Sequence, residues 1–197
     1  MTSGVQSDDP MVRLLADRTR ARAEKDPCAN LCTLANIDTQ GAPQARTLVL
    51  RELDDQLAVF INTTSPKWQS LLAGPVSVVV WLPSIQLQYR LSCQTAAIPQ
   101  HTVHDSWHMR PEPPKRMDWF YSEVAPQSSA IGDRQRLLGA LEELQLPQPL
   151  TPPASAHGLF LEPESIERLH LGEDNGIHDR QLYRLTTAGW SVTTLVP

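Results

Sequence analysis

Two basic side chains near the start of a short predicted helix carry the most definite chemistry in the chain. Arg46 opens the strand-like run Arg46–Arg51, and Lys67 follows Ser65 and Pro66. Serine is a favoured helix N-cap, and proline is favoured at the first helical position. Free backbone N–H groups at such an end attract an anion, and Lys67 adds a positive charge there. The segment predicts a phosphate site, and a capped surface helix with an exposed lysine is the alternative.

Other reactive side chains give weaker patterns. His101, His104 and His108 share one face of a predicted helix with Asp105 beside them, and such a face could bind a transition metal. Three histidines spread over two turns would need ligands from elsewhere, so we predict a solvated face and no metal site. The three cysteines contain no Cys-x-x-Cys pair, which predicts reduced thiols without a disulfide framework, a zinc site or a nucleophilic role.

The composition of the chain limits the classes of function that it can have. The chain has 197 residues, is 41% hydrophobic and carries a net charge of −5. These values are typical of a water-soluble protein and argue against nucleic-acid or anionic-membrane binding. No apolar run approaches a membrane span, and the polar opening lacks the features of a signal peptide. We expect a cytoplasmic protein with one domain over residues 1–197.

Periodicity predicts an N-terminal helical segment within residues 1–26, with a solvent-facing amphipathic helix from Pro10 to about Lys25. Five strands follow, separated mostly by short turn signals that favour antiparallel hairpins. They are predicted over residues 31–37, 44–51, 57–61, 76–82 and 87–97.

An insertion over residues 99–153 interrupts the strands. It contains a helical piece near residues 101–109, a loop-like centre over Pro111–Lys115 and a capped amphipathic helix over Asp133–Leu144. Four more strands are predicted over residues 157–161, 166–171, 181–186 and 190–196. The fold class is therefore mainly β, an antiparallel barrel with peripheral helices.

With the strands in this order, the chain resembles the pyridoxamine 5'-phosphate oxidase-like family of proteins that bind flavin mononucleotide (FMN) on a split β-barrel. The segments that carry the resemblance are Leu31–Asp38, Arg46–Arg51, Asn62–Lys67, Leu87–Arg90, Glu162–Glu167 and His178–Arg180. The resemblance implies an FMN-binding split barrel that forms a homodimer, with FMN sites between the subunits. It also implies an oxidoreductase that acts on a small molecule.

The resemblance assigns FMN contacts to particular residues. Arg46 and the adjoining backbone would hold the flavin, and a guanidinium fork and a lysine ammonium both suit a phosphate. Gln88 would contact the ring edge, and Arg180 would favour the reduced, anionic flavin. The complete implied set is Arg46, Thr47, Leu48, Val49, Ser65, Lys67, Gln88, Gln127, Ser128 and Arg180.

The substrate positions are more divergent. Arg51 and Arg110 stand where the family binds the substrate phosphate, and His178 would lie near the reacting substrate as a proton carrier. Ser106, Pro114 and Gly176 replace a family tyrosine, serine and arginine, and His170 replaces a tryptophan. The chain thus resembles a divergent branch, and pyridoxamine 5'-phosphate is in doubt as its substrate. A non-catalytic FMN storage or sensing protein, and a barrel without FMN, are the alternatives.

Overall fold

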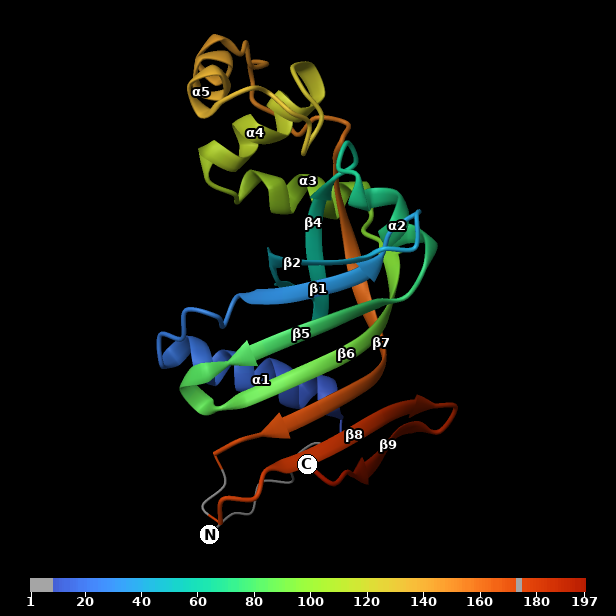
Figure 1. Ribbon diagram of the computed structural model, residues 1–197. Coiled ribbons are helices and arrows are strands. Elements are labelled where there is room, and N and C mark those ends of the chain that lie inside the picture. The colour runs from blue at the N-terminus through green and yellow to red at the C-terminus, as the bar shows by residue number, and fades with distance from the viewer. Residues whose placement is uncertain (1–8, 173–174) are drawn as a thin grey trace.

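An antiparallel sheet dominates the computed structural model of the chain, which describes residues 9–172 and 175–197 (Figure 1). The part of the predicted N-terminal segment before Asp9 lies outside the described residues. Within the described part the sheet has nine strands, in the order β2-β1-β5-β6-β7-β4-β3, and β7 also pairs with β8, which pairs with β9. Their bounds are β1 Leu31–Ile37, β2 Pro43–Val49, β3 Arg51–Leu53, β4 Gln56–Asn62, β5 Val76–Leu82, β6 Leu87–Ala97, β7 Ala156–His170, β8 Asp179–Thr186 and β9 Gly189–Thr194.

The sheet curls into a split barrel, which confirms the predicted fold class (Figure 1). Two hairpins show how local sequence directs this topology. Asp54 and Asp55 both adopt positive φ, 48° and 63°, as a two-residue turn between β3 and β4 requires. Gly41, at φ +84°, closes the turn between β1 and β2. These turns agree with the short turn signals predicted between the strands.

Two strand predictions were wrong. The separate strands expected at residues 157–161 and 166–171 form one strand, β7, whose register against β6 shifts between Ser92 and Cys93. Pro163 lies at this irregularity, where a missing N–H costs little, so the proline does not end the strand. The strand expected over residues 44–51 is divided at Leu50, and β3 pairs with β4 instead of β1.

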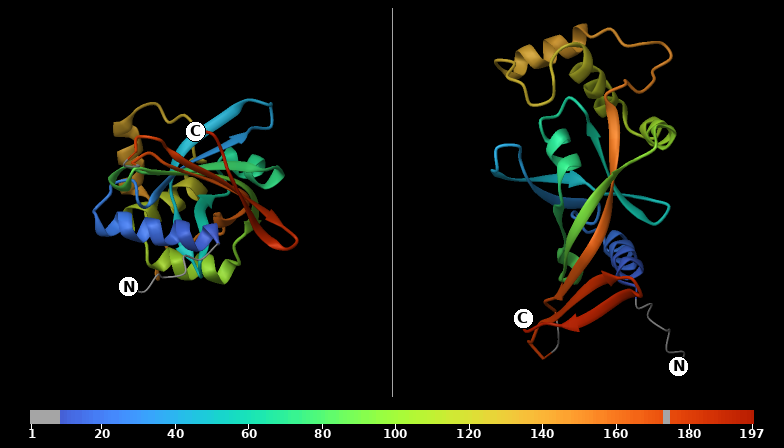
Figure 2. Two further views of the ribbon diagram at one scale, coloured as in Figure 1. Left: turned by 90° about the horizontal axis from the view of Figure 1, so that it is seen from below. Right: turned by 90° about the vertical axis from the view of Figure 1, so that its right-hand side faces the viewer.

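Five α-helices and a 3₁₀ turn accompany the sheet within the described residues. Their bounds are α1 Pro10–Ala23, α2 Lys67–Ala73, η1 Pro83–Ile85, α3 Gln100–His108, α4 Glu112–Glu123 and α5 Arg134–Glu143. None of them is long and apolar enough to cross a membrane. Helices α3, α4 and α5 gather at one end of the sheet, and the β8–β9 hairpin projects at the other end (Figures 1 and 2).

Two helix predictions also need correction. The loop expected over Pro111–Lys115 is the first turn of α4, because prolines are tolerated where backbone N–H groups have no intrahelical partner. Ser65 does not cap α2: the cap position is Pro66, without a side-chain hydrogen bond, and the helix spans only seven residues.

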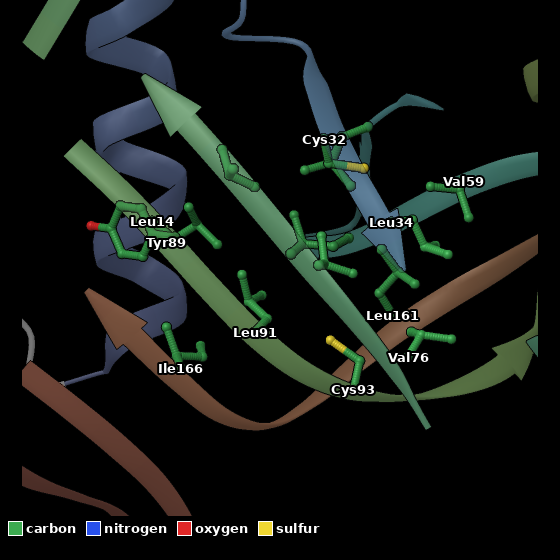
Figure 3. Packing of buried hydrophobic residues seen from close by; sticks show 14 of the residues in the cluster. Leu14, Cys32, Leu34, Val59, Val76, Tyr89, Leu91, Cys93, Leu161 and Ile166 are labelled. Atoms are coloured by element: carbon green, nitrogen blue, oxygen red, sulfur yellow. The ribbon is translucent and has the colours of Figure 1, made fainter. Parts of the chain in front are cut away.

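The main core lies inside the curl of the sheet and beneath α1 (Figure 3). It includes Leu14 of α1, Leu34 of β1, Tyr89 and Leu91 of β6, and Ile166 of β7. A second cluster joins the sheet to α3, and comprises Ala58, Ile98, Val103, Trp107 and Ala156. Burying this apolar area provides the main stabilisation of the fold.

Cys32 and Cys93 lie in the main core, where burial raises the pKa of the Cys32 thiol to about 11 and that of Cys93 to about 12. Both thiols are therefore protonated at neutral pH and poor nucleophiles, in agreement with the prediction.

Arg18 is fully buried, which corrects the expectation of a solvated basic face on α1. Its Nε donates to the Ala29 carbonyl at 3.1 Å, and Nη2 donates to the Leu50 carbonyl at 3.0 Å. Its Nη1 is ion-paired with Glu52, which Arg22 also contacts. Arg18 thus ties α1 to the irregular backbone beside β1 and β2.

Replacing Arg18 with alanine should lower the free energy of unfolding by about 3–5 kcal/mol, because it leaves two buried carbonyls unpaired and opens a cavity. Urea denaturation measures this loss. Arg20→Ala is the matched control, since the Arg20 side chain is 59% exposed, and it should change stability by less than about 0.5 kcal/mol. Equal effects of the two substitutions would contradict the assigned role of Arg18.

Candidate functional site

Arg46 points toward the inner face of the sheet. Strand β2 pairs with β1 so that Arg46 lies opposite the buried Leu34, and opposite residues point to the same face. The half-buried guanidinium donates to the side-chain oxygen of Asn36, two residues farther along β1. Burial lowers the pKa of Arg46 from its usual value. Arg46 is thus held by a neutral partner.

Asn36 connects Arg46 to helix α2. Its Nδ2 donates to Ser70 Oγ at 2.9 Å, and Ser70 Oγ donates in turn to the Lys67 carbonyl at 3.0 Å. Asn36 and Ser70 are both buried. This chain of hydrogen bonds fixes the position of Arg46 relative to the start of α2.

Lys67 is half-buried beside Arg46. Its Nζ donates to Ser65 Oγ at 2.8 Å and lies 3.5 Å from Gln127 Oε1. Burial lowers the pKa of Lys67, and the positive charge of Arg46 lowers it further. Neither cation forms an ion pair with a carboxylate of the described residues, so their combined charge remains available to an anion.

The turn before α2 also holds Gln127. Asn62 Oδ1 accepts hydrogen bonds from the backbone N–H and the hydroxyl of Thr64, and Thr64 Oγ1 accepts from the Gln127 N–H at 3.2 Å. Gln127, distant in sequence, is thereby fixed next to Lys67. The adjacent Ser128 is exposed and has a positive φ of 74°.

A cavity of about 230 Å³ opens beside Lys67, between the sheet and helices α3 and α4. A second cavity of about 170 Å³ adjoins it, because Phe60 and Arg110 line both. The residues lining the first cavity are Leu48, Phe60, Ile61, Asn62, Lys67, Val103, Trp107, Arg110, Pro114, Met117, Asp118, Tyr121, Gln127, Ala156 and His157. The second is lined by Arg51, Glu52, Leu53, Phe60, Ser106, Met109 and Arg110.

Gln88 and Arg180 belong to a different part of the molecule. Gln88 of β6 lies opposite Leu169 of β7, which lies opposite Arg180 of β8. Leu87 and Tyr89 on either side of Gln88 are buried in the core, so Gln88 and Arg180 face away from it. The Arg180 guanidinium contacts both carboxylate oxygens of Glu167, at 3.1 and 3.2 Å.

The predicted FMN contacts therefore form two groups. Arg46, Leu48, Ser65, Lys67 and Gln127 lie around α2. Thr95 Oγ1 donates to the Leu71 carbonyl, which places α2 beside the end of β6. Gln88 precedes Thr95 by seven residues on β6 and so lies roughly 20 Å from α2.

The remaining predicted residues lie as follows. Thr47 and Val49 are exposed on β2, and Arg51 lines the second cavity with Ser106. His178 is exposed just before β8, at the end of the molecule that also carries Arg180, and Gly176 has a positive φ of 73°.

Sequence reasoning missed Asn36 and Asp118, and it assigned no site role to Trp107. The register of the β1–β2 hairpin could have indicated Asn36, because it places Asn36 diagonally across from Arg46 on the same face. Trp107 and Asp118 come from two helices of the insertion, and no spacing in the sequence predicts that their side chains meet.

Comparison with known proteins identifies the family of the chain. Residues 9–99 match the family model described as pyridoxamine 5'-phosphate oxidase, FMN-binding domain. A pyridoxine/pyridoxamine 5'-phosphate oxidase of Pseudomonas syringae pv. tomato is 31% identical over 182 residues, covering 89% of this chain and 82% of that protein. The corresponding protein of Chromohalobacter salexigens is 32% identical over 184 residues, covering 90% and 83%. The chain belongs to this family.

Two solved structures share the fold. PhzG from Burkholderia lata 383, in complex with tetrahydrophenazine-1-carboxylic acid, has a TM-score of 0.83 and 22% identity, covering 98% of this chain and 95% of that one. A pyridoxamine 5'-phosphate oxidase-related, FMN-binding protein from Nostoc punctiforme has a TM-score of 0.79 and 22% identity, covering 98% and 100%. These likenesses confirm the split-barrel architecture.

FMN is the cofactor of this family's domain, and the donor set around α2 fits it. A phosphate needs positive charge and hydrogen-bond donors, and Arg46 and Lys67 provide both without an opposing carboxylate. The fit rests on side chains, since a helix as short as α2 has only a small dipole.

Lys67→Met should leave the protein equally stable or raise its melting temperature by roughly 2 °C in phosphate-free buffer. The lowered pKa of Lys67 means that folding disfavours its charged form, which lowers the free energy of unfolding. This loss of stability is fully present below the folded-state pKa of Lys67 and disappears as the pH rises through that pKa. Inorganic phosphate should raise the melting temperature of the wild type but not of Lys67→Met. Lys25→Met is the control and should respond to phosphate like the wild type. A phosphate response that survives Lys67→Met would contradict the assignment.

Proposed function

We propose that the protein is an FMN-dependent oxidoreductase acting on a small molecule. The observation that carries this proposal is a pair of cations, Lys67 in the cavity wall and Arg46 beside it. They are held by Asn36, Ser65 and Gln127 instead of by carboxylates. Two adjacent half-buried cations without counter-charges lower the stability of the ligand-free protein, and an anionic ligand would offset this loss. In this proposal residues 1–197 form one FMN-binding domain, with residues 99–153 as an insertion.

We further propose that two copies of the chain build each FMN site. Gln88 and Arg180 face away from the core and lie far from α2, so one ligand bound at Lys67 cannot use both groups of the same chain. A two-fold axis would bring the partner's Gln88 and the partner's Arg180 to the cavity beside Lys67. The 230 Å³ cavity of one chain is also smaller than the roughly 300–1,000 Å³ typical of complete ligand sites.

The outer face of the sheet suits such a contact. Ile37, Val49 and Trp81 are exposed there by 57%, 47% and 36%. Ile37 and Trp81 are flanked on β1 and β5 by buried residues, so both project from the opposite face. Val49 of β2 lies opposite Leu31, the residue before the buried Cys32, and so points to the same outer face. Exposed apolar side chains on one sheet face favour burial against a partner. Trp81 lies directly opposite Gln88, which places a predicted FMN contact on the same face.

The catalytic part of the proposal rests on family membership and on His178. FMN, when bound, supplies hydride transfer to or from its ring. His178 is exposed near Arg180, so a dimer that brings Arg180 to the cavity would bring an imidazole able to move a proton near neutral pH. The curated relatives are named as oxidases.

A second candidate is a non-catalytic FMN storage or sensing protein. This candidate is favoured by the ion pair between Arg110 and Asp118, because Asp118 neutralises an arginine that was expected to contact the substrate. Bound flavin that neither an amine nor a nicotinamide cofactor reduces would favour this second candidate. Reduction of the bound flavin by either would favour the oxidoreductase.

Purified wild-type protein should retain FMN after removal of excess cofactor, and the Arg46→Ala/Lys67→Ala variant should lose it. Removing two charge-assisted contacts should weaken FMN binding at least about a hundredfold. Visible absorption of the washed protein measures retention. The matched control is Arg20→Ala/Lys25→Ala, which removes two exposed cations and should bind FMN normally. A wild type that never retains FMN would refute the proposal.

The shared site predicts complementation between two inactive variants. Lys67→Ala and Arg180→Ala homodimers should each bind FMN poorly, because every site lacks one contact. After unfolding and refolding together in equal amounts, half of the dimers should be mixed and carry one intact site, so about a quarter of all sites should recover. Flavin absorbance of the refolded mixture measures this. If the two residues served the same site within one chain, the mixture would bind no better than the separate variants.

A further inference from the structure

Arg110 lies where the two cavities meet, in the segment between helices α3 and α4. Its Nη1 lies 2.6 Å from Asp118 Oδ2, and the two side chains are 23% and 9% exposed. A guanidinium in this position could contact an anionic substrate, but Asp118 already provides its counter-charge. The positive charge at this end of the cavity is therefore cancelled within the protein.

Asp118 is held in place by a second donor. Trp107 Nε1 donates to the same carboxylate oxygen at 2.9 Å, and Trp107 is only 1% exposed. Burial raises the pKa of the neighbouring Tyr121 hydroxyl, and the negative charge of Asp118 raises it further. Asp118 is thus a fixed negative charge in the cavity wall.

The other charges nearby do not restore a phosphate site. Lys115 Nζ donates to the His108 carbonyl at 2.7 Å and lies 5.1 Å above the Trp107 ring. Arg51 lines only the second cavity and is exposed, and an exposed cation contributes little binding energy. Much of the wall around Arg110 is apolar, formed by Phe60, Val103, Trp107 and Met117.

We propose that Asp118 is a specificity-determining residue: it occupies Arg110, so that the cavity beside the cofactor takes an uncharged organic substrate and not a phosphate ester. This inference rests on the proposed function, in which the phosphate of FMN uses Arg46 and Lys67. A substrate phosphate would have to displace a largely buried carboxylate from Arg110 and then lie next to it. Repulsion between these two anions in a low-dielectric cavity opposes that exchange.

The test compares two probes that differ only by a phosphate, pyridoxine 5'-phosphate and pyridoxine, with FMN-loaded protein by titration calorimetry. Wild type should bind pyridoxine at least as tightly as pyridoxine 5'-phosphate, because Asp118 cancels the charge of Arg110 and repels the phosphate. Asp118→Asn keeps an oxygen for Trp107 Nε1 but removes the charge, and should prefer the phosphorylated probe at least about tenfold. Asp105→Asn, an exposed carboxylate on α3, is the matched control and should keep the wild-type ratio.

The double variant Arg110→Gln/Asp118→Asn, which has the net charge of the wild type, should also keep the wild-type ratio. A tenfold preference of the wild type for the phosphorylated probe that is lost in the double variant would overturn the inference. This comparison can be made even if Asp118→Asn fails to fold. Equal ratios in Asp118→Asn and Asp105→Asn would also overturn it. Flavin absorbance of the same samples reports FMN retention separately, so a failure of the proposed function is recognised independently of the binding ratio.

Discussion

The site depends on two positive charges, Arg46 and Lys67, that lie side by side without a carboxylate between them. Burial lowers the pKa of both side chains, and the positive charge of Arg46 lowers the pKa of Lys67 further. The fold maintains this arrangement by hydrogen bonds from the cations to neutral oxygens of Asn36, Ser65 and Gln127. Three separate segments therefore have to be fixed in space before an anion can bind.

Strand β7 determines how the rest of the site is arranged. Its first part pairs with β4, next to the turn that leads into α2, and its last part pairs with β8, which carries Arg180. A single strand of 15 residues spans about 50 Å, so it keeps these two regions apart. The same strand that completes the barrel thereby separates the two groups of predicted cofactor contacts, and this separation supports a site shared by two chains.

Much of the fold could be predicted because alternation and turn chemistry are local. The hairpin at Asp54 and Asp55 needs only two residues that tolerate positive φ. The errors arose where tertiary context decides. Pro163 sits at an irregularity of β7, and the burial of Arg18 depends on carbonyls and a carboxylate from distant segments. In the site, residue type indicated Arg46 and Lys67, whereas the contact of Asp118 with Arg110 and Trp107 requires the packing of α3 against α4.

The charges along the cavity suggest how its two ends can differ in function. At one end Lys67, with Arg46 beside it, lacks a counter-charge, and at the other end Asp118 cancels Arg110. The cations at one end bond to Asn36, Ser65 and Gln127, whereas Arg110 at the other end bonds to Asp118, so the two ends have different direct partners. A carboxylate placed beside Arg110 can therefore alter the substrate end without removing the cations that suit a cofactor phosphate. These separate direct partners explain how one barrel can keep its cofactor end while its substrate end diverges.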